Sequence, residues 1–305
     1  RDAAAPARRR PGLAADGVRL REYALRRRPL TSSVASTLAT LPLHLQPNGD
    51  EDLDLLFRGR VALLQRRQGY RTSIDALMLA AFAAHVSENR PRVLDLGAGS
   101  GLVAVLLGLH DPETALTLIE RQPGLAGRAR RNLTLNGLAA RAQVVEYDIA
   151  QPWPPTLAGD MTVGFDLVVS NPPYYRRAGR MLPADAERAD AHYESSAGIE
   201  RFVEVAAACL TENGLFCCVY PANGALRLQE SLSAVGLLDQ RCVHVFHRDG
   251  DEIATRVLMA ARRGPPRAAD AQSWVLHVAE PPNGRYHVVI EQFITDLDIR
   301  FGPDA

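Results

Sequence analysis

The sequence predicts an α/β protein with a mostly parallel, seven-stranded sheet, helices on both faces, and an antiparallel hairpin at the end. Between residues 92 and 235, short aliphatic runs alternate with stretches of helical periodicity, which is the pattern of a parallel sheet with crossover helices. Two strand-like runs, 241–248 and 253–262, then flank the turn residues Asp249-Gly250-Asp251, which are typical of a hairpin.

The composition excludes several classes of protein. The chain has 305 residues, a formal net charge of zero and 47% hydrophobic residues, which argues against a disordered, collagen-like or disulfide-built chain. No uncharged apolar run reaches the roughly 18 residues that cross a bilayer, so we expect no membrane partner. The four cysteines, Cys209, Cys217, Cys218 and Cys242, form no C-x-x-C pair. We therefore predict buried thiols and no metal site.

Three segments differ in character. Residues 1–50 are rich in Arg, Ala and Ser and are expected to be a disordered extension. Residues 51–264 are predicted to form the folded domain, with residues 265–305 as a tail packed on it. The first 30 residues hold nine Arg and three acidic residues, a net of +6, so the remainder carries −6. A basic arm for nucleic acid, or a plastid or mitochondrial transit peptide, are alternatives for this extension; otherwise we expect a cytoplasmic protein.

The elements follow in order. Residues 55–57 and 61–64 are predicted to pair as a hairpin ahead of the sheet. Ser73 is a suitable N-cap for a helix that runs through Ala84. Strands are predicted at residues 92–96, 115–120, 143–148, 165–170 and 214–220, and helices at 102–109, 123–135, 199–210 and 225–235.

A glycine-rich turn follows the first strand of the sheet. It reads Asp95-Leu96-Gly97-Ala98-Gly99-Ser100-Gly101, and its glycines allow a tight turn and close approach of the backbone to a ligand. Glu120 ends the second strand, where a carboxylate can accept hydrogen bonds from both ribose hydroxyls. Asp148 ends the third, where a carboxylate can accept from an adenine amino group. Parallel strands end at one edge of a sheet, so these residues predict a site for a nucleotide-like cofactor.

A second motif, Asn171-Pro172-Pro173-Tyr174, directly follows the fourth strand. The prolines end the strand and stiffen the turn. The Asn171 side chain and the Pro172 carbonyl offer two acceptors, and Tyr174 offers a flat face for stacking. A planar amine is a poor nucleophile, because its lone pair is delocalised. Two acceptors that hold its N–H groups can draw the nitrogen toward a pyramidal geometry and aim the lone pair at a methyl donor.

Together the two motifs resemble the class I S-adenosylmethionine-dependent methyltransferases that act on adenine N6 or glutamine N5, enzymes of Rossmann-like fold. The flanking sequences narrow the resemblance. They resemble the bacterial family that methylates N6 of an anticodon-loop adenine in a valine tRNA. The resemblance lies in three places, namely Gln68-Gly69-Tyr70-Arg71-Thr72-Ser73-Ile74-Asp75-Ala76, Tyr175 and Ala191-His192-Tyr193-Glu194. The resemblance covers residues 52–295. The Arg-rich extension and the long loop 152–164 depart from the family pattern.

The resemblance implies a tRNA methyltransferase, and we expect it to act as a monomer and without a metal. Asn171, Pro172, Pro173 and Tyr174 would hold the target base. S-adenosylmethionine would be bound by Tyr70, Arg71, Asp75, Asp95, Gly97, Ala98, Gly99, Gly101, Glu120, Asp148 and Asn171. Tyr175, Arg176, Arg177 and Arg180 follow the second motif and are predicted to contact the RNA, with phosphate contacts also expected from Arg58, Arg60, Arg66, Arg67 and Arg71.

Three alternatives remain open at this point. A release-factor glutamine N5-methyltransferase would share both motifs, but it would carry a helical domain for which residues 51–85 are too short. A DNA adenine methyltransferase would need a base-reading domain. A non-catalytic methyltransferase-like module would bind RNA or a partner without turnover. The net negative charge of residues 31–305 counts against an RNA enzyme.

Overall fold

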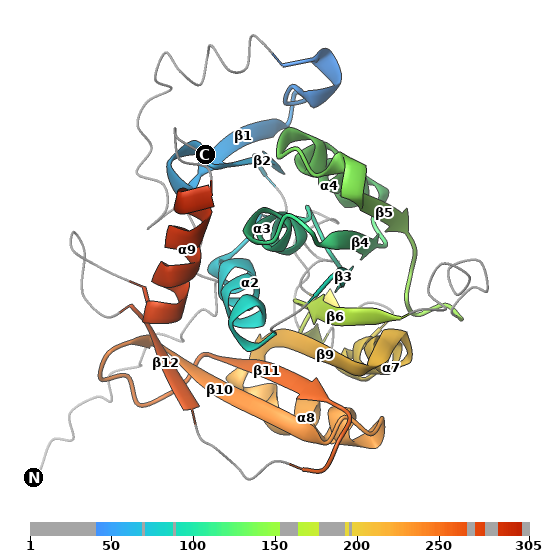
Figure 1. Cartoon of the computed structure of the whole chain (residues 1–305), viewed down its shortest axis with the longest axis vertical. Helices are drawn as coiled ribbons and strands as arrows, with labels where there is room; N and C mark the ends of the chain where they lie inside the picture. Colours follow the sequence, from blue (N-terminus) through green and yellow to red (C-terminus); the bar gives the residue numbers. More distant parts are fainter. Residues whose placement is uncertain are drawn as a thin grey trace, which may run out of the picture.

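The computed structural model describes residues 41–68, 71–87, 90–152, 164–176, 193–194, 197–266, 272–277 and 286–300 (Figure 1). Within these residues, eight strands form the main sheet in the order β12-β10-β11-β9-β6-β3-β4-β5. The strands are β3 (Arg92–Leu96), β4 (Ala115–Glu120), β5 (Ala142–Glu146), β6 (Phe165–Ser170), β9 (Leu210–Pro221), β10 (Asp239–Arg248), β11 (Arg256–Arg262) and β12 (Gln272–His277). The helices are α2 (Ile74–Val86), α3 (Leu102–His110), α4 (Pro123–Leu135), α7 (Ile199–Cys209), α8 (Ala225–Ala234) and α9 (Val288–Arg300).

The sheet confirms the predicted α/β class, with one strand more than expected. All its neighbouring strands are parallel except β11, which runs antiparallel to both β9 and β10. The additional strand, β12, pairs parallel with β10 and lies in the segment predicted as a tail. Only Trp274 and Leu276 carry its buried alternation, which is too short a pattern to stand out in the sequence. The sequence predicted that Asp148 ends the third strand. In the structure, β5 ends at Glu146, and Asp148 follows it by two residues.

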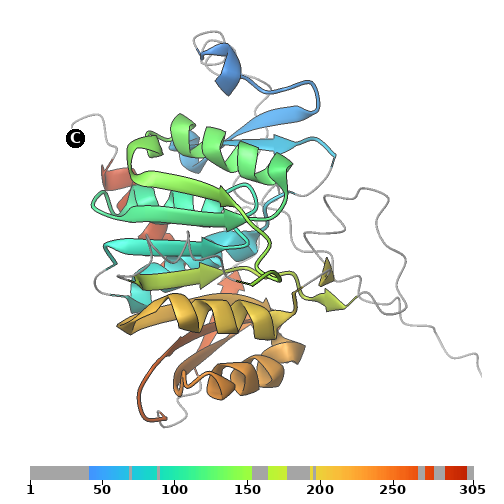
Figure 2. The same ribbon diagram turned by 90° about the vertical axis from the view of Figure 1, so that its right-hand side faces the viewer.

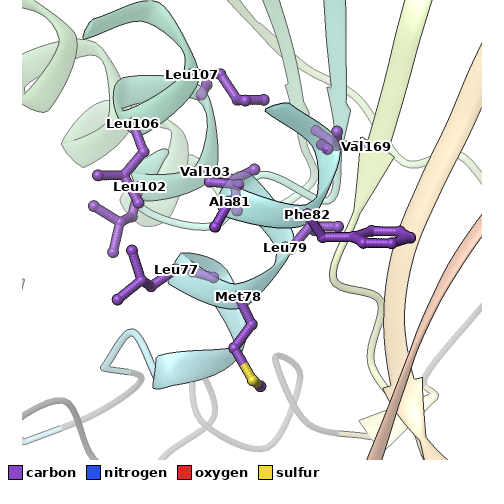
Figure 3. Close-up of a cluster of buried hydrophobic side chains, with 14 of the residues drawn as sticks. Leu77, Met78, Leu79, Ala81, Phe82, Leu102, Val103, Leu106, Leu107 and Val169 are labelled. Carbon is purple, nitrogen blue, oxygen red and sulfur yellow. The ribbon is translucent and has the colours of Figure 1, made fainter. Parts of the chain in front are cut away.

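Helices cover both faces of the sheet and divide the core into two clusters. One cluster joins α2, α3, α4 and α9 to one face, and the other joins α7 and α8 to the opposite face (Figures 1 and 2). Cys217 and Cys218 are both buried and belong to different clusters, which confirms that neighbouring residues of β9 face opposite sides. Figure 3 shows the centre of the first cluster, where side chains of α2 and α3 such as Leu77 and Leu106 pack together.

The predicted N-terminal hairpin forms a sheet of its own, attached to α4 by two asparagines. Its strands, β1 (Glu51–Leu56) and β2 (Val61–Arg66), pair antiparallel. Asn132 Oδ1 accepts from the Leu64 N–H at 2.7 Å, and Asn136 Oδ1 accepts from the Ala62 N–H at 3.0 Å. Asn132 Nδ2 also donates to the Ser100 carbonyl at 2.8 Å. One asparagine therefore links the hairpin to the glycine-rich turn.

Several predictions concern residues beyond this description. The extension is described only from residue 41, and residues 153–163 of the long loop lie outside the described residues. Two short strands, β7 (Tyr175–Arg176) and β8 (Tyr193–Glu194), pair parallel beyond the second motif.

In the part of the chain that is described, no helix is long and apolar enough to cross a membrane. Those residues also hold no group of three or more His, Cys, Asp or Glu side chains arranged to bind a metal ion.

Candidate active site

Strand register brings both predicted motifs to one edge of the sheet. Leu96, the last residue of β3, is paired with Ile119 of β4 and with Ser170, the last residue of β6. The Ser170 hydroxyl donates to the Leu96 carbonyl at 2.8 Å. Gly97 directly follows β3 and Asn171 directly follows β6, so the glycines of the turn and the second motif begin side by side. This is the carboxyl edge of the parallel strands, where α/β proteins bind ligands.

The glycine-rich turn has a backbone that only glycine adopts readily. Gly97, Gly99 and Gly101 have φ of +72°, +58° and +84°. The N–H groups of Gly97 and Ala98 both donate to the Ile119 carbonyl, at 2.9 and 3.0 Å, which holds the turn against the end of β4. A Cβ on Gly97 would lie 3.1 Å from the Phe202 ring of α7. The turn therefore packs closely against Phe202 of α7, and it leads into α3 at Gly101.

Two buried carboxylates lie at this turn: Glu120 accepts a hydrogen bond from it, and Asp95 begins it. Glu120 is 7% exposed; its Oε2 accepts from the Gly99 N–H at 2.9 Å and its Oε1 from the Gln122 N–H at 2.8 Å. Asp95 is 2% exposed, and its Oδ2 has no hydrogen-bond partner among the described residues. Burial raises the pKa of both groups, that of Asp95 to about 7, with a smaller raising effect from Glu120 and a lowering one from the Ala104 N–H. The unpartnered buried oxygen of Asp95, at the start of the glycine-rich turn, fits a site for a polar cofactor.

The raised pKa of Asp95 predicts a pH-dependent stability without ligand. The ordinary value is 3.8 and the folded value about 7, so the folded state binds the extra proton and loses stability as pH rises from about 4 to about 7. Asp95→Asn removes this titration. We expect the melting temperature of the variant, relative to the parent, to rise steadily across this range. A constant difference from pH 4 to pH 8 would contradict the assignment.

The second motif lies against a cation that sequence analysis did not identify. Pro172 is buried, whereas Asn171 and Tyr174 are partly exposed. Arg256 Nη2 donates to the Tyr174 hydroxyl at 3.4 Å, and the guanidinium carbon lies 5.4 Å from the centre of the tyrosine ring. Arg256 Nε donates to Asp75 Oδ2 at 3.2 Å. A strand-starting arginine carries no motif, so only the register of β11 could have revealed this contact.

The other predicted cofactor residues have defined surroundings. The Tyr147 N–H donates to the Glu120 carbonyl at 3.1 Å, which holds the neighbouring Asp148 beside the end of β4. Asp148 Oδ1 accepts from the Ala150 N–H at 3.0 Å. Arg71 forms an ion pair with Asp54 of the hairpin. Tyr70, Arg177 and Arg180 lie outside the described residues, and only the backbone of Tyr175 and Arg176 is described. The binding roles of all these residues stay predictions.

Arginines of the hairpin region are engaged with acidic neighbours. Arg66 Nε lies 2.7 Å from Asp50, and Arg67 Nε lies 2.9 Å from Asp52. Their charges are therefore partly balanced within the hairpin. The region is less positive than the sequence alone suggests, so phosphate contacts expected from these two arginines would have to compete with the ion pairs.

Comparison with known proteins identifies the family. The family model of the methyltransferase small domain matches residues 74–240, more than half of the chain. The chain belongs to the methyltransferase small domain family. The matched range holds the glycine-rich turn and Asn171-Pro172-Pro173-Tyr174, the motifs on which the predicted resemblance rests, and confirms it. Arg256 and α9 lie beyond the matched range.

Curated relatives share about half of this chain. The tRNA1(Val) (adenine(37)-N6)-methyltransferase of Escherichia coli O1:K1 / APEC is 34% identical over 170 residues, which cover 54% of this chain and 66% of the relative. The Salmonella enteritidis PT4 protein of the same name is 34% identical over 156 residues, covering 51% and 60%. The matches thus span just under two thirds of these relatives.

A solved structure shares the fold. The crystal structure of a predicted O-methyltransferase from Agrobacterium tumefaciens matches with a TM-score of 0.54 and 21% identity, covering 73% of this chain and 96% of that chain. At this identity the likeness concerns the architecture alone. It agrees with the Rossmann-like sheet predicted from the sequence.

Proposed function

We propose that this protein transfers a methyl group from S-adenosylmethionine to N6 of an adenine in the anticodon loop of a tRNA. The observation that carries the proposal is the pairing of Leu96 with Ser170, because it sets the glycine-rich turn directly beside Asn171. A cofactor site and an acceptor site therefore share one edge of the sheet. The names of the 34% identical relatives support adenine N6 of tRNA as the acceptor.

The cofactor residues proposed from the sequence suit S-adenosylmethionine. Gly97 and Gly99 would allow a close approach of the ligand, Glu120 would accept from the ribose hydroxyls, and Asp148 would accept from the adenine amino group. The unpartnered oxygen of Asp95 would accept a further hydrogen bond from the ligand or a bridging water. When bound, this cofactor supplies an electrophilic methyl group on a sulfonium.

The second motif would hold the acceptor base. The Asn171 side-chain oxygen and the Pro172 carbonyl accept from the two amino N–H groups, and the Tyr174 ring stacks on the base. As the new C–N bond forms, the C–S bond breaks with its electron pair passing to sulfur, and the nitrogen then releases a proton to solvent. The base must leave its stack to reach such a pocket. RNA contacts by Tyr175, Arg176, Arg177 and Arg180 remain part of the proposal.

One structural observation favours this acceptor over a release factor. Residues 51–87 contribute a hairpin and the helix α2, in the position where a release-factor glutamine methyltransferase would carry a helical domain. The proposal keeps the sequence-based predictions of a monomer, of the cytoplasm as the compartment and of no metal requirement.

The test is incubation of the purified chain with methyl-labelled S-adenosylmethionine and unmodified total tRNA, followed by digestion to nucleosides. We expect the label in N6-methyladenosine. Label in a different nucleoside would refute the adenine assignment. Absence of label from tRNA, with label in release-factor protein, would transfer the proposal to glutamine. Cofactor binding without any transfer would favour a non-catalytic module.

A further inference from the structure

Arg256 contacts two residues that lie far from it in the sequence: Asp75, 181 residues away, and Tyr174, 82 residues away. It is the first residue of β11, and it is paired with Pro221, the last residue of β9. Cys218 of β9 is paired with Ser170, so Pro221 lies three residues further toward the carboxyl edge. β11 runs antiparallel to β9, and its beginning therefore lies at the edge that carries the second motif. The reversal of this one strand delivers a cation to the candidate acceptor site.

The contacts of Arg256 are divided between a buried carboxylate and the aromatic ring. Its Nε is 3.2 Å from Asp75, and the two side chains are only 15% and 6% exposed. Nη2 reaches the Tyr174 hydroxyl at 3.4 Å, and Nη1 donates to the Thr255 carbonyl at 3.1 Å. The guanidinium lies over the ring, 5.4 Å from its centre. Asp75 thus holds the Arg256 guanidinium on one side. On the other side, the planar face of the guanidinium and its Nη2 N–H restrict the Tyr174 ring.

We propose that Arg256 is a positioning residue that holds the Tyr174 ring in the orientation needed to stack on the acceptor base. Its kinetic consequence rests on the proposed methyl transfer, whereas the orientation of the ring does not. A base that stacks on Tyr174 must use the face away from the guanidinium. Arg256 therefore determines which side of the ring receives the acceptor, and a lysine cannot replace it, because an ammonium lacks the planar fork that reaches Asp75 and the tyrosine together.

The main variants are Arg256→Gln and Arg256→Lys, and Arg262 supplies the matched control. Arg262 ends the same strand and pairs with Asp239 at 2.7 Å, with 49% of its side chain exposed. Because Arg256→Gln leaves Asp75 buried without its cation, the double variant Asp75→Asn/Arg256→Gln is prepared as well. In that pair both charges are removed, so the site can fold even if the single variant does not.

The first measurement is independent of substrate. The chain has eight tyrosines, and ¹³C labelling of their rings allows the Tyr174 signal to be identified by its loss in Tyr174→Phe. We expect this signal to shift in every Arg256 variant that folds, the double variant included, and to stay in place in Arg262→Gln. An unchanged Tyr174 signal in folded Arg256 variants would overturn the inference, whatever happens to activity.

The second measurement is the split between kcat and KM on tRNA, together with the Kd for S-adenosylmethionine. In Arg256→Gln and Arg256→Lys, which retain Asp75, a misoriented acceptor ring should lower kcat about tenfold to a hundredfold and leave the cofactor Kd nearly unchanged. In a Tyr174→Ala background, Arg256→Gln should cost no further activity, because the residue acts through the ring. A weaker cofactor Kd with unchanged kcat would mean that Arg256 serves the helix bearing Asp75 instead, which overturns the inference.

The two measurements separate the inference from the proposed function. If the parent protein leaves tRNA unlabelled but the Tyr174 signal moves in the Arg256 variants, the proposed function fails and the positioning role stands. If tRNA is methylated and the signal does not move, the opposite holds.

Discussion

Replacing Asn171 with alanine should abolish most methyl transfer while leaving cofactor binding intact. The side-chain oxygen of Asn171 is proposed to hold one amino N–H of the acceptor, and this interaction strengthens as the nitrogen becomes pyramidal. Removing one preorganised polar contact of this kind lowers kcat by about 10²–10³-fold. The backbone carbonyl of Pro172 and the ring of Tyr174 remain, so the acceptor still binds and KM should change much less. Single-turnover kinetics on unmodified tRNA would measure the loss directly.

The control for this variant is another asparagine at the same edge of the sheet. Asn223 is exposed in the short 3-10 helix Ala222–Gly224 that follows β9. Asn223→Ala should keep full activity, and both variants should bind S-adenosylmethionine as the parent does in a calorimetric titration. Near-normal turnover by Asn171→Ala would sink the proposed role. An equal loss of cofactor affinity would mean that Asn171 acts mainly through the cofactor contact that the resemblance also implies for it, and not through the acceptor.

The sequence predicted the central elements well because local patterns coincide with burial there. β3, β4, β6 and α4 have the predicted bounds. Their strands are bracketed by a proline, a charged residue or a motif, and their apolar runs are buried on both faces. Ser73 caps α2 as expected, with its hydroxyl accepting from the Asp75 N–H at 3.3 Å. These features depend on residues close together in the chain.

What the sequence could not predict depends on partners far apart in the chain. β12 has six residues and acquires its place by pairing with β10. α9 packs its Phe293 and Leu297 into the cluster that also contains α2, about 200 residues earlier in the sequence. Arg256 is one arginine among 35 basic residues, and its closeness to Tyr174 follows from strand register alone. Periodicity identifies elements, but it does not determine which of their ends meet.

Replacing Gly97 with valine should impair both cofactor binding and folding. Gly97 has a φ of +72°, where an L-residue costs about 1–2 kcal/mol, and the cost is greatest for a β-branched side chain. The new Cβ would lie 3.1 Å from the buried Phe202 ring, and such overpacking costs about 1–3 kcal/mol. We expect a lower melting temperature, and an affinity for S-adenosylmethionine weaker on the order of tenfold to a hundredfold, since about 1.4 kcal/mol corresponds to a factor of ten.

Gly137 provides the comparison that separates backbone strain from cofactor binding. It has a similar φ of +70°, and a Cβ there would meet nothing within 4 Å. Gly137→Val should therefore lose stability through backbone strain alone and bind the cofactor normally. If it weakened cofactor binding as much as Gly97→Val, the loss would reflect general instability. If Gly97→Val folded and bound the cofactor as the parent does, the turn would not be the cofactor site. Only a binding defect confined to Gly97 assigns the turn to the ligand, because the two glycines have similar φ angles and differ in their surroundings.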